Sequence, residues 1–259
     1  MRPLAIDLYC GLGGWTEGLL LEGFDVVGFD IERHDYGDGH AYPAQLVLQD
    51  VRTIVGQQFR DAALIVASPP CQEFSYRAMP WKRAKALPPP FAGIELFNAC
   101  FRIQREACAA AGRHVPLVVE NVVGAQRWVG HAAWHHGSYY LWGDVPALMP
   151  IVRRVSKIPG ADWNRFRERG EVSPHWNVSG LKNTGGSWFS VGSDGANNNP
   201  VKVGGSWFGP AAEWQSMRRG HSKSSQRKRA SAMIAKIPLD LARHVGRVYY
   251  PSAAKASRQ

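Results

Sequence analysis

Cysteine is scarce in this sequence and forms none of the patterns that mark a metal site or a disulfide framework. The 259 residues contain four cysteines, Cys10, Cys71, Cys100 and Cys108, and no two of them form a Cys-x-x-Cys pair. They also lack metal-ligand spacing with the nine histidines. We therefore expect no metal site and no disulfide framework, and a reducing compartment suits such a chain.

Long apolar runs are missing as well. No stretch of the sequence reaches the roughly 20 apolar residues that a membrane-spanning helix needs. The first residues enter a predicted strand directly and show none of the successive regions of a secretory signal peptide. We expect a monomeric cytoplasmic protein with no membrane partner.

Acidic residues are scarce in the second part of the chain. Residues 151–259 hold 19 lysines and arginines against 6 acidic residues, whereas residues 1–150 hold 12 against 15. Nearly all of the net charge of +10 therefore lies in one part of the chain. A basic lobe on a slightly acidic body is typical of a polyanion partner, most often nucleic acid, although a generally basic surface has the same composition.

Short apolar runs alternate with helical patterns along the first 150 residues. These patterns predict an open α/β sheet whose strands are buried on both faces, and the chain is long enough for one sizeable core and a smaller lobe. The predicted strands are Leu4–Tyr9, Asp25–Phe29, Leu46–Leu48, Ala63–Ala67 and Val115–Val119, and a long helix is predicted at Phe91–Ala111.

A glycine-rich turn follows the first predicted strand. The turn Cys10–Gly14 leads into a helix predicted at Trp15–Glu22. Glycines let the backbone approach a ligand closely, and a helix start offers unpaired N–H groups to a negatively charged group such as a carboxylate. Taken by itself, the pattern also suits a simple tight turn.

Acidic residues end the next two predicted strands. Asp30, with Glu32 in reserve, follows the second strand, where α/β proteins grip ribose hydroxyls. Asp50 follows the third strand and is placed to accept a hydrogen bond from an adenine amino group. A solvated loop carboxylate is the ordinary alternative for each.

Cys71 lies just past the fourth predicted strand, in the stretch Ser68–Ser75. A cysteine nucleophile needs partial exposure and nearby positive charge, because the thiolate is the reactive form. Four basic residues follow it closely, namely Arg77, Lys82, Arg83 and Lys85. The stretch Met79–Pro90, rich in proline and basic residues, is expected to be a loop that closes over the site. A buried structural cysteine is the alternative.

Glu120 follows the fifth predicted strand, so we expect it at the same edge of the sheet as Cys71. A glutamate that ends a buried strand is costly unless it has a partner or a function. The two side chains form a candidate active site. A glutamate that only holds loop amides is the alternative.

Three motifs taken together resemble the DNA (cytosine-5)-methyltransferase family, in its short bacterial or phage type. They are Asp7–Gly14, Pro70–Ser75 and Glu120–Val122, in the family's order and approximate spacing, and Ala230–Val248 resembles the family's closing helix. The resemblance implies an α/β fold with a doubly wound, mostly parallel sheet that binds S-adenosylmethionine. It assigns residues 1–150 plus 230–259 to a catalytic, cofactor-binding domain. Residues 151–229 are then a small irregular β-rich lobe for target recognition and DNA binding.

The resemblance also implies roles for single residues. Cys71 would add to carbon 6 of a flipped-out cytosine, Glu120 would hold or protonate nitrogen 3, and carbon 5 would take the methyl group. The implied catalytic residues are Cys71, Glu120 and Arg127. The implied cofactor-binding residues are Asp7, Tyr9, Gly11, Gly13, Gly14, Asp30, Ile31, Asp50, Pro69 and Lys236. The implied contacts to double-stranded DNA are Gln72, Ser75, Arg77, Arg218, Arg219, Lys223, Arg227 and Lys228.

The sequence departs from the family pattern in three places. Arg127 is the only arginine kept from a Gln-x-Arg-x-Arg motif, and Tyr139–Gly143 ends the apparent sheet early, which predicts rearranged later strands. Lys236 stands where the family has Gly-Asn-Ser-Val, near the methionine end of the cofactor. A lysine there would favour carboxy-S-adenosylmethionine, so 5-carboxymethylcytosine is an alternative product.

The region 151–229 contains a small repeat, Gly-Gly-Ser-Trp-Phe, at Gly185–Phe189 and Gly204–Phe208. The repeat suggests two similar turns that enter short strands. The stretch Arg218–Arg229 has six basic residues and no acidic one, which predicts contacts to phosphates without sequence preference. For the whole chain, a tRNA cytosine methyltransferase and a non-catalytic DNA-binding relative remain alternatives.

Overall fold

The computed structural model describes residues 2–34, 41–75, 88–136, 139–149, 232 and 235–251. The chain divides into two compact units. The first unit contains residues 1–35, 39–150 and 236–259, and the second contains residues 36–38 and 151–235. The elements and contacts discussed below belong to the first unit.

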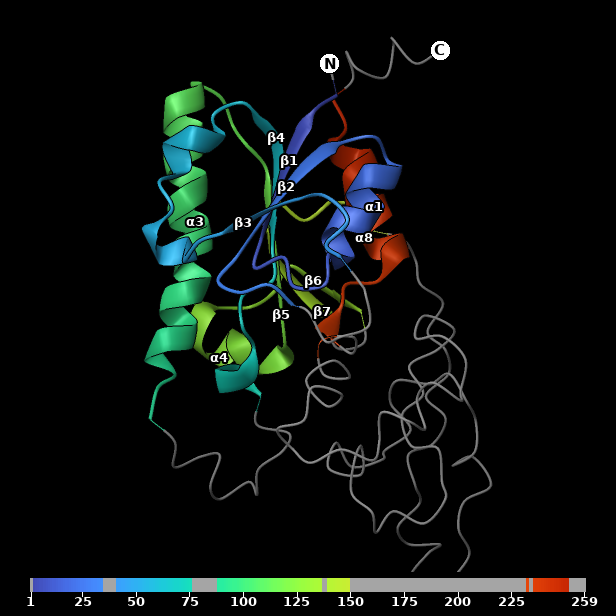
Figure 1. Ribbon diagram of the computed structural model, residues 1–259. Coiled ribbons are helices and arrows are strands. Elements are labelled where there is room, and N and C mark those ends of the chain that lie inside the picture. Colours follow the sequence, from blue (N-terminus) through green and yellow to red (C-terminus); the bar gives the residue numbers. More distant parts are fainter. Residues whose placement is uncertain are drawn as a thin grey trace, which may run out of the picture. The chain divides into compact units, whose positions relative to one another are not determined.

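A seven-stranded sheet with the order β3-β2-β1-β4-β5-β7-β6 forms the centre of this unit (Figure 1). Strands β1 to β5 run parallel, β7 is antiparallel to β5, and β6 is antiparallel to β7. The strands are β1 (Leu4–Leu8), β2 (Asp25–Asp30), β3 (Gln45–Leu48), β4 (Ala62–Ala67), β5 (Leu117–Asn121), β6 (Trp134–His136) and β7 (Tyr139–Gly143).

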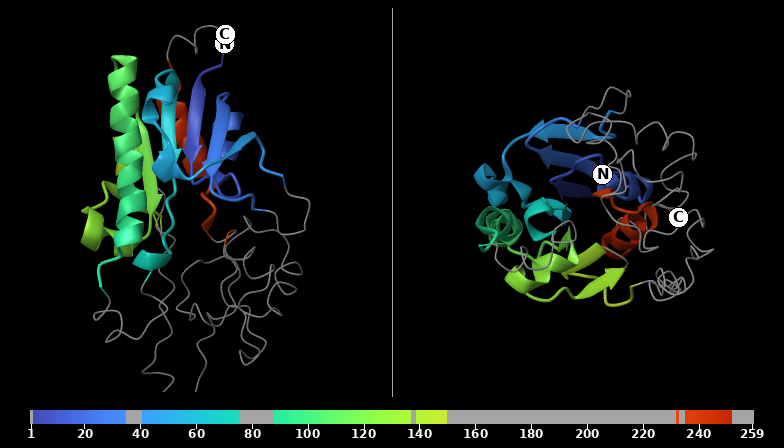
Figure 2. Two further views of the ribbon diagram at one scale, coloured as in Figure 1. Left: turned by 60° about the vertical axis from the view of Figure 1, so that its left-hand side comes forward. Right: turned by 90° about the horizontal axis from the view of Figure 1, so that it is seen from below.

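Helices cover both faces of the sheet. The helix α3 lies on one face, and α1 and α8 lie together on the other (Figures 1 and 2). The bounds are α1 (Gly14–Leu21), α3 (Phe91–Ala111), α4 (Gln126–Val129) and α8 (Leu239–Tyr249), with short 3₁₀ helices η1 (Val51–Thr53), η2 (Gly56–Phe59), η3 (Gln72–Phe74) and η5 (Val123–Ala125). The predicted α/β fold with a doubly wound, mostly parallel sheet is confirmed.

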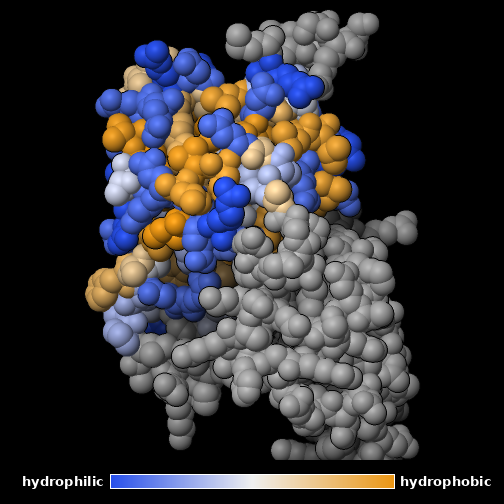
Figure 3. Space-filling view, in the orientation of Figure 1, coloured by the Kyte–Doolittle hydropathy of each residue, from blue (hydrophilic) through white to orange (hydrophobic). Residues whose placement is uncertain are grey.

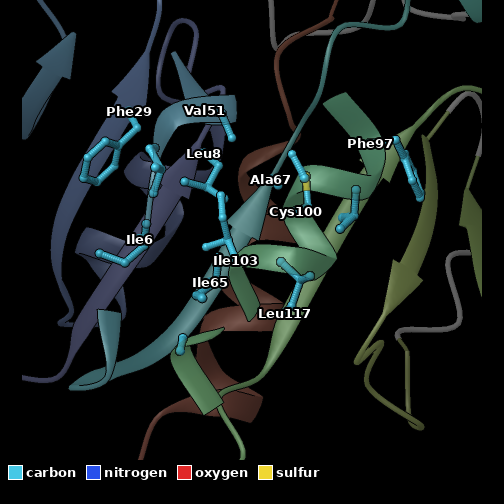
Figure 4. Packing of buried hydrophobic residues seen from close by; sticks show 14 of the residues in the cluster. Ile6, Leu8, Phe29, Val51, Ile65, Ala67, Phe97, Cys100, Ile103 and Leu117 are labelled. Carbon is cyan, nitrogen blue, oxygen red and sulfur yellow. The ribbon is translucent and has the colours of Figure 1, made fainter. Parts of the chain in front are cut away.

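The residues of β4 show why the sheet needs two helical layers. Ile65 and Ala67 pack with Cys100 and Ile103 of α3 on one face (Figure 4). Leu64 belongs to the second cluster, on the face of α1 and α8. A strand that is apolar on both sides is stable only between two covering layers, because each layer shields the side chains on one face of the sheet from water.

The surface of the described unit is mixed, with hydrophobic and hydrophilic residues interspersed on the face that Figure 3 shows. The exposed apolar side chains include Ile31 and Leu48. Among the described residues, no helix combines the length and the apolar composition that crossing a membrane requires. The same residues contain no group of three potential metal ligands.

Three predicted elements differ from the observed ones. The fifth strand is Leu117–Asn121, so Glu120 lies inside the sheet and not after it. The helix expected from Ala230 is interrupted, and α8 begins at Leu239, because the residue before Pro238 is sterically disfavoured in helical conformation. Tyr139–Gly143 is β7, which is the last strand along the described part of the chain, as expected, but in the sheet it lies between β5 and β6.

Candidate active site

The strand order places a crevice at the carboxyl ends of β1 and β4. From β1 the chain builds outward to β2 and β3 on one side, and β4 and β5 lie on the other side. Such a switch point is where open α/β sheets bind ligands. The glycine turn follows β1 and the cysteine loop follows β4, and the Trp15 indole N–H, which donates to Ser68 Oγ at 3.0 Å, joins the two. The topology therefore brings both predicted motifs to one edge.

The glycine turn has an unusual backbone conformation. Tyr9, Gly11 and Gly13 have φ values of 57°, 51° and 78°. Tyr9 tolerates this left-handed conformation because its hydroxyl donates to the carbonyl of Leu96 on α3 at 2.9 Å, which anchors the ring. At Gly11, nothing lies within 4 Å of the position that a Cβ would occupy. The turn thus leaves space above its first glycine.

Asp30 ties the end of β2 to this turn. Its carboxylate accepts the N–H of Gly11 at 2.9 Å and of Ile31 at 2.8 Å, and His34 Nε2 lies 3.3 Å from it. Burial opposes the charge of Asp30, but the bonds from His34 and Gly11 outweigh it and lower the pKa of the carboxyl. The hydrogen bond between His34 and Asp30 also raises the pKa of His34. Asp30 is therefore a fixed carboxylate at the crevice, and sequence reasoning missed its histidine partner.

The groups around Asp30 fit a nucleoside. Ile31 exposes 68% of its surface beside the carboxylate and offers an apolar face to a ring. The Glu32 side chain is exposed as well. A carboxylate for ribose hydroxyls, an exposed aliphatic side chain for the base and an open glycine turn are the groups that an adenosine cofactor requires.

Asp50 is engaged by its own loop. Arg52 approaches both carboxylate oxygens, with its Nη2 2.6 Å from Oδ2 and its Nε 3.1 Å from Oδ1, and the Arg52 N–H donates to Oδ1 at 2.9 Å. The hydrogen bonds from the Arg52 side chain and backbone lower the pKa of Asp50. A ligand amino group at Asp50 would have to share this carboxylate with Arg52.

Asp7, Gly13 and Gly14 lie behind the crevice and not on its surface. Asp7 is 0% exposed and accepts a hydrogen bond from Thr16 Oγ1 at 2.7 Å. The position of a Cβ on Gly14 lies 2.5 Å from the backbone N of Ile237, and that of Gly13 lies 2.8 Å from Pro43 Cδ. The Asp7 carboxyl is therefore enclosed next to Thr16 of α1, and its predicted contact with the cofactor stays a prediction.

Cys71 and Glu120 come together at the ends of β4 and β5. Cys71 is half-buried and precedes η3, and Glu120 is 9% exposed near the end of β5. Burial and then the charge of Glu120 raise the pKa of the Cys71 thiol to about 11. The two groups are thus close enough for one charge to act on the other. The basic residues expected to lower this pKa, among them Arg77, lie outside the described residues.

Two further side chains hold the cysteine loop in place. Asn121, next to Glu120, donates from Nδ2 to the carbonyl of Pro69 at 3.0 Å and is 1% exposed. Glu73 accepts the N–H of Gly93 at 2.7 Å, in the first turn of α3, where a carboxylate is favoured by the helix dipole. Sequence reasoning missed both contacts, because each joins segments that are far apart in the chain.

The other predicted site residues fall into three groups. Arg127 is exposed and its guanidinium lies 4.8 Å from the centre of the Trp128 ring, and its catalytic role stays a prediction. Lys236 Nζ lies 2.5 Å from Glu17 Oε1, so its charge already has a partner. Gln72 is exposed and Ser75 is half-buried in the loop after Cys71. The residues outside the described part of the chain are Arg77, Arg218, Arg219, Lys223, Arg227 and Lys228.

Comparisons with known proteins agree with the motifs. Residues 4–87 match the model of the family "C-5 cytosine-specific DNA methylase", which confirms the predicted family over this part of the chain. No curated protein matches.

Solved structures with partial similarity include three methyltransferases. A DNA modification methyltransferase encoded within an E. coli prophage is 24% identical, with 48% of this chain and 33% of that chain covered and a TM-score of 0.35. S. pombe Dnmt2 is 21% identical, with 50% of this chain and 38% of that chain covered and a TM-score of 0.34. Entamoeba histolytica EhMeth is 16% identical, with 49% of this chain and 40% of that chain covered and a TM-score of 0.33. This chain therefore spans a third to two fifths of their lengths.

Proposed function

We propose that this chain, whose residues 4–87 match the C-5 cytosine-specific DNA methylase family, methylates carbon 5 of cytosine in double-stranded DNA. S-adenosylmethionine is the proposed methyl donor, and Cys71 is the proposed nucleophile. The target base must leave the stack, because carbon 6 cannot be reached inside a duplex. The observation that carries the proposal is the register of β4 and β5, in which Ala67 pairs with Val119. Cys71 and Glu120 therefore lie at the ends of neighbouring strands, at the same edge of the sheet as the glycine turn.

The two side chains have complementary tasks. The Cys71 sulfur forms a bond to carbon 6, and the electron density that it pushes into the ring is neutralised by a proton that Glu120 holds at nitrogen 3. Before the attack, the Cys71 thiol gives its proton to a base. After carbon 5 has received its methyl group, that carbon loses its proton to a base, and the sulfur of Cys71 leaves carbon 6 as a thiolate with the electron pair of the broken bond. Nitrogen 3 returns its proton to Glu120, and the ring is aromatic again.

Burial, with the charge of Glu120 as the second cause, raises the pKa of the Cys71 thiol. Protonation of Glu120 removes only the second cause, so formation of the thiolate also needs a base or a positive charge nearby.

Asp30, Ile31 and the backbone of Gly11 are the residues proposed to hold the donor. When bound, S-adenosylmethionine supplies a methyl group on a positively charged sulfur. The carboxylate of Asp30 accepts hydrogen bonds from ribose hydroxyls, and Ile31 covers one face of the base. Because Lys236 pairs with Glu17, its charge does not require the extra carboxylate of carboxy-S-adenosylmethionine.

Covalent trapping tests the nucleophile. DNA containing 5-fluorocytosine blocks removal of the group at carbon 5, so the wild-type protein with its donor should form a stable protein–DNA adduct. The adduct should be absent with Cys71→Ser and should form normally with Cys108→Ser, the matched control on α3. Trapping by Cys71→Ser would overturn the assignment.

Product analysis tests the substrate and the donor. Duplex DNA and tRNA are each incubated with either donor, and the modified nucleosides are weighed by mass spectrometry. The proposal expects 5-methylcytosine from duplex DNA. Modification of tRNA alone, or 5-carboxymethylcytosine as the main product, would contradict it.

A further inference from the structure

The segment that leads into β3 reaches underneath the glycine turn. Thr16 Oγ1 donates to Asp7 Oδ2 at 2.7 Å, and the Tyr42 hydroxyl hydrogen-bonds with Thr16 Oγ1. A threonine hydroxyl has a single proton, so Tyr42 is the donor in the second bond. The Tyr42 hydroxyl also lies 3.5 Å from Asp7 Oδ2. Three side chains from β1, α1 and this segment therefore form one buried polar cluster.

The sequence leaves room for this segment at two glycines. A Cβ on Gly28 of β2 would lie 2.1 Å from the Tyr42 hydroxyl oxygen, and a Cβ on Gly13 would lie 2.8 Å from Pro43 Cδ. Both distances are far below van der Waals contact. Gly28 and Gly13 thus receive two consecutive residues, Tyr42 and Pro43, which lock the segment against both the sheet and the turn.

The cluster depends on its hydroxyl groups. Asp7 is fully buried, and among the described residues its Oδ1 has no hydrogen-bond partner. Burial is the main reason why the pKa of Asp7 rises to about 7. Burial also raises the pKa of Tyr42, so the tyrosine hydroxyl keeps its proton and remains a hydrogen-bond donor. The position of the Asp7 carboxyl, two residues before the left-handed part of the turn, therefore rests on Thr16 and Tyr42.

We propose that Tyr42 is a positioning residue for the donor site, which holds the turn Gly11–Gly14 in its binding conformation through Thr16 and Asp7. This inference rests on the proposed function for the identity of the ligand. A turn with left-handed residues loses much conformational freedom when a ligand orders it, so a turn that is ordered beforehand binds more tightly. Tyr42 has no direct contact with the ligand in this role.

Removal of the hydroxyl is the first test. Tyr42→Phe keeps the ring against Gly28 and loses the bond to Thr16. We expect the dissociation constant for S-adenosylhomocysteine, measured by calorimetry, to rise roughly 3- to 10-fold, the worth of one hydrogen bond. Without ligand, the amides of Gly11 to Thr16 should exchange faster with deuterium, and the single-turnover rate at saturating donor should stay unchanged. Tyr249→Phe, which loses a bond to the Asp144 carbonyl, is the matched control and should alter neither binding nor exchange in the turn.

A glycine substitution gives an independent test. The Cβ of Gly28→Ala would meet only the far end of the Tyr42 side chain among its nearest contacts, so the ring should move and the same loss of affinity should follow. In a Tyr42→Ala background, Gly28→Ala should cause no further loss, because the methyl group then has space. Full additivity of the two losses would overturn the inference.

The outcomes separate this inference from the proposed function. If the wild type binds S-adenosylhomocysteine and Tyr42→Phe binds it equally well with unchanged exchange in the turn, the positioning role is wrong and the proposed function stands. If the wild type does not bind it at all, the proposed function fails and this inference fails with it.

Discussion

At the scale of single residues, buried polar groups hold the two loops of the site. Asn121 bonds the loop before Cys71, Asp30 bonds Gly11, and Asp7 bonds Thr16. Each of these residues is at most 7% exposed, so each bond would be costly to leave unmade. These residues therefore decide the shape of the crevice even where they touch no ligand.

Asn121 gives the first prediction. Asn121→Ala leaves the buried carbonyl of Pro69 without its donor, which should lower the free energy of unfolding by about 1–3 kcal/mol. The loop of Cys71 should loosen, so the rate of adduct formation with 5-fluorocytosine DNA should fall more than donor affinity does. Denaturant unfolding and trapping kinetics measure the two effects. An unchanged trapping rate at full folding would show that the loop needs no such anchor.

Asp7 gives a prediction on pH. Burial raises its pKa from 3.8 to about 7 in the folded protein, so between about pH 4 and 7 the folded state binds a proton that the unfolded state has released. The proton on Asp7 should therefore make stability decrease as pH rises from about 4 to 7. In Asp7→Asn the decrease between pH 4.5 and 6 should be absent, as urea unfolding at pH 4.5, 6 and 8 would measure. A decrease above about pH 6.5 should remain in both proteins, because the raised pKa of His34 lets the folded state keep a proton that the unfolded state loses.

The carboxyls of lowered pKa do not obscure the effect. Asp30, Glu22 and Glu106 have pKa values below their ordinary range of about 4, so the stability that they contribute is lost only as pH falls below that range. Parallel pH curves for the wild type and Asp7→Asn would refute the prediction.

At the scale of elements, α1 and α8 pack with their backbones close together. A Cβ on Gly18 would lie 2.4 Å from the Cβ of Ala242, and the Arg243 and Arg247 side chains of α8 bond Glu22 just after α1. The helix α8 thus completes, together with α1, the helical layer on this face of the sheet. Two helices more than 200 residues apart in the sequence therefore pack as one layer.

Gly18→Ala should separate these helices. The new methyl group would meet the backbone of α8, which cannot move aside as a side-chain end does, so we expect a loss of about 1–3 kcal/mol in the free energy of unfolding. Gly246→Ala on α8 is the matched control, because its Cβ would lie 3.2 Å from the end of the Leu19 side chain. Its stability should stay within about 1 kcal/mol of the wild type, since alanine also favours the helix. Equal losses in thermal and denaturant unfolding would contradict this account.

At the scale of the whole molecule, charge divides the chain. The basic excess lies in residues 151–259, whereas the cysteine, the glutamate and the glycine turn lie in residues 1–150. Affinity for duplex DNA should therefore come mostly from one part of the chain and chemistry from the other. This division remains a prediction, since most of residues 151–259 lie outside the described part.

Salt dependence tests the division. Replacement of Arg219, Arg227 and Lys228 by glutamine should weaken binding to duplex DNA of any sequence. It should also reduce the slope of log affinity against log salt by about 0.9 for each phosphate that is no longer neutralised. The control replaces three arginines of the first part, Arg2, Arg60 and Arg105, and should leave the slope nearly unchanged. Fluorescence anisotropy across a salt series measures both, and equal slopes in all three proteins would exclude a phosphate-binding role.

The sequence by itself determined the parallel sheet, the long helix Phe91–Ala111 and the positions of Cys71, Glu120 and the glycine turn. These follow from local patterns, since apolar runs, prolines and glycines restrict the backbone wherever they stand. The predicted bounds of that helix agree with the observed ones. Each of the five predicted strands differs from the observed strand by one or two residues at one or both ends, because hydrogen bonds to neighbouring strands set these ends.

Only the tertiary structure decided which side chains meet. The bond of Asn121 to Pro69, the pair of Lys236 with Glu17 and the reach of Tyr42 to Thr16 each join residues between 26 and 219 positions apart. No local pattern encodes such a contact, because it depends on strand order and on the packing of helices across the sheet. Burial is decided in the same way: Asp7 is fully enclosed, whereas nothing lies within 4 Å of the Cβ position of Gly11 in the same turn region.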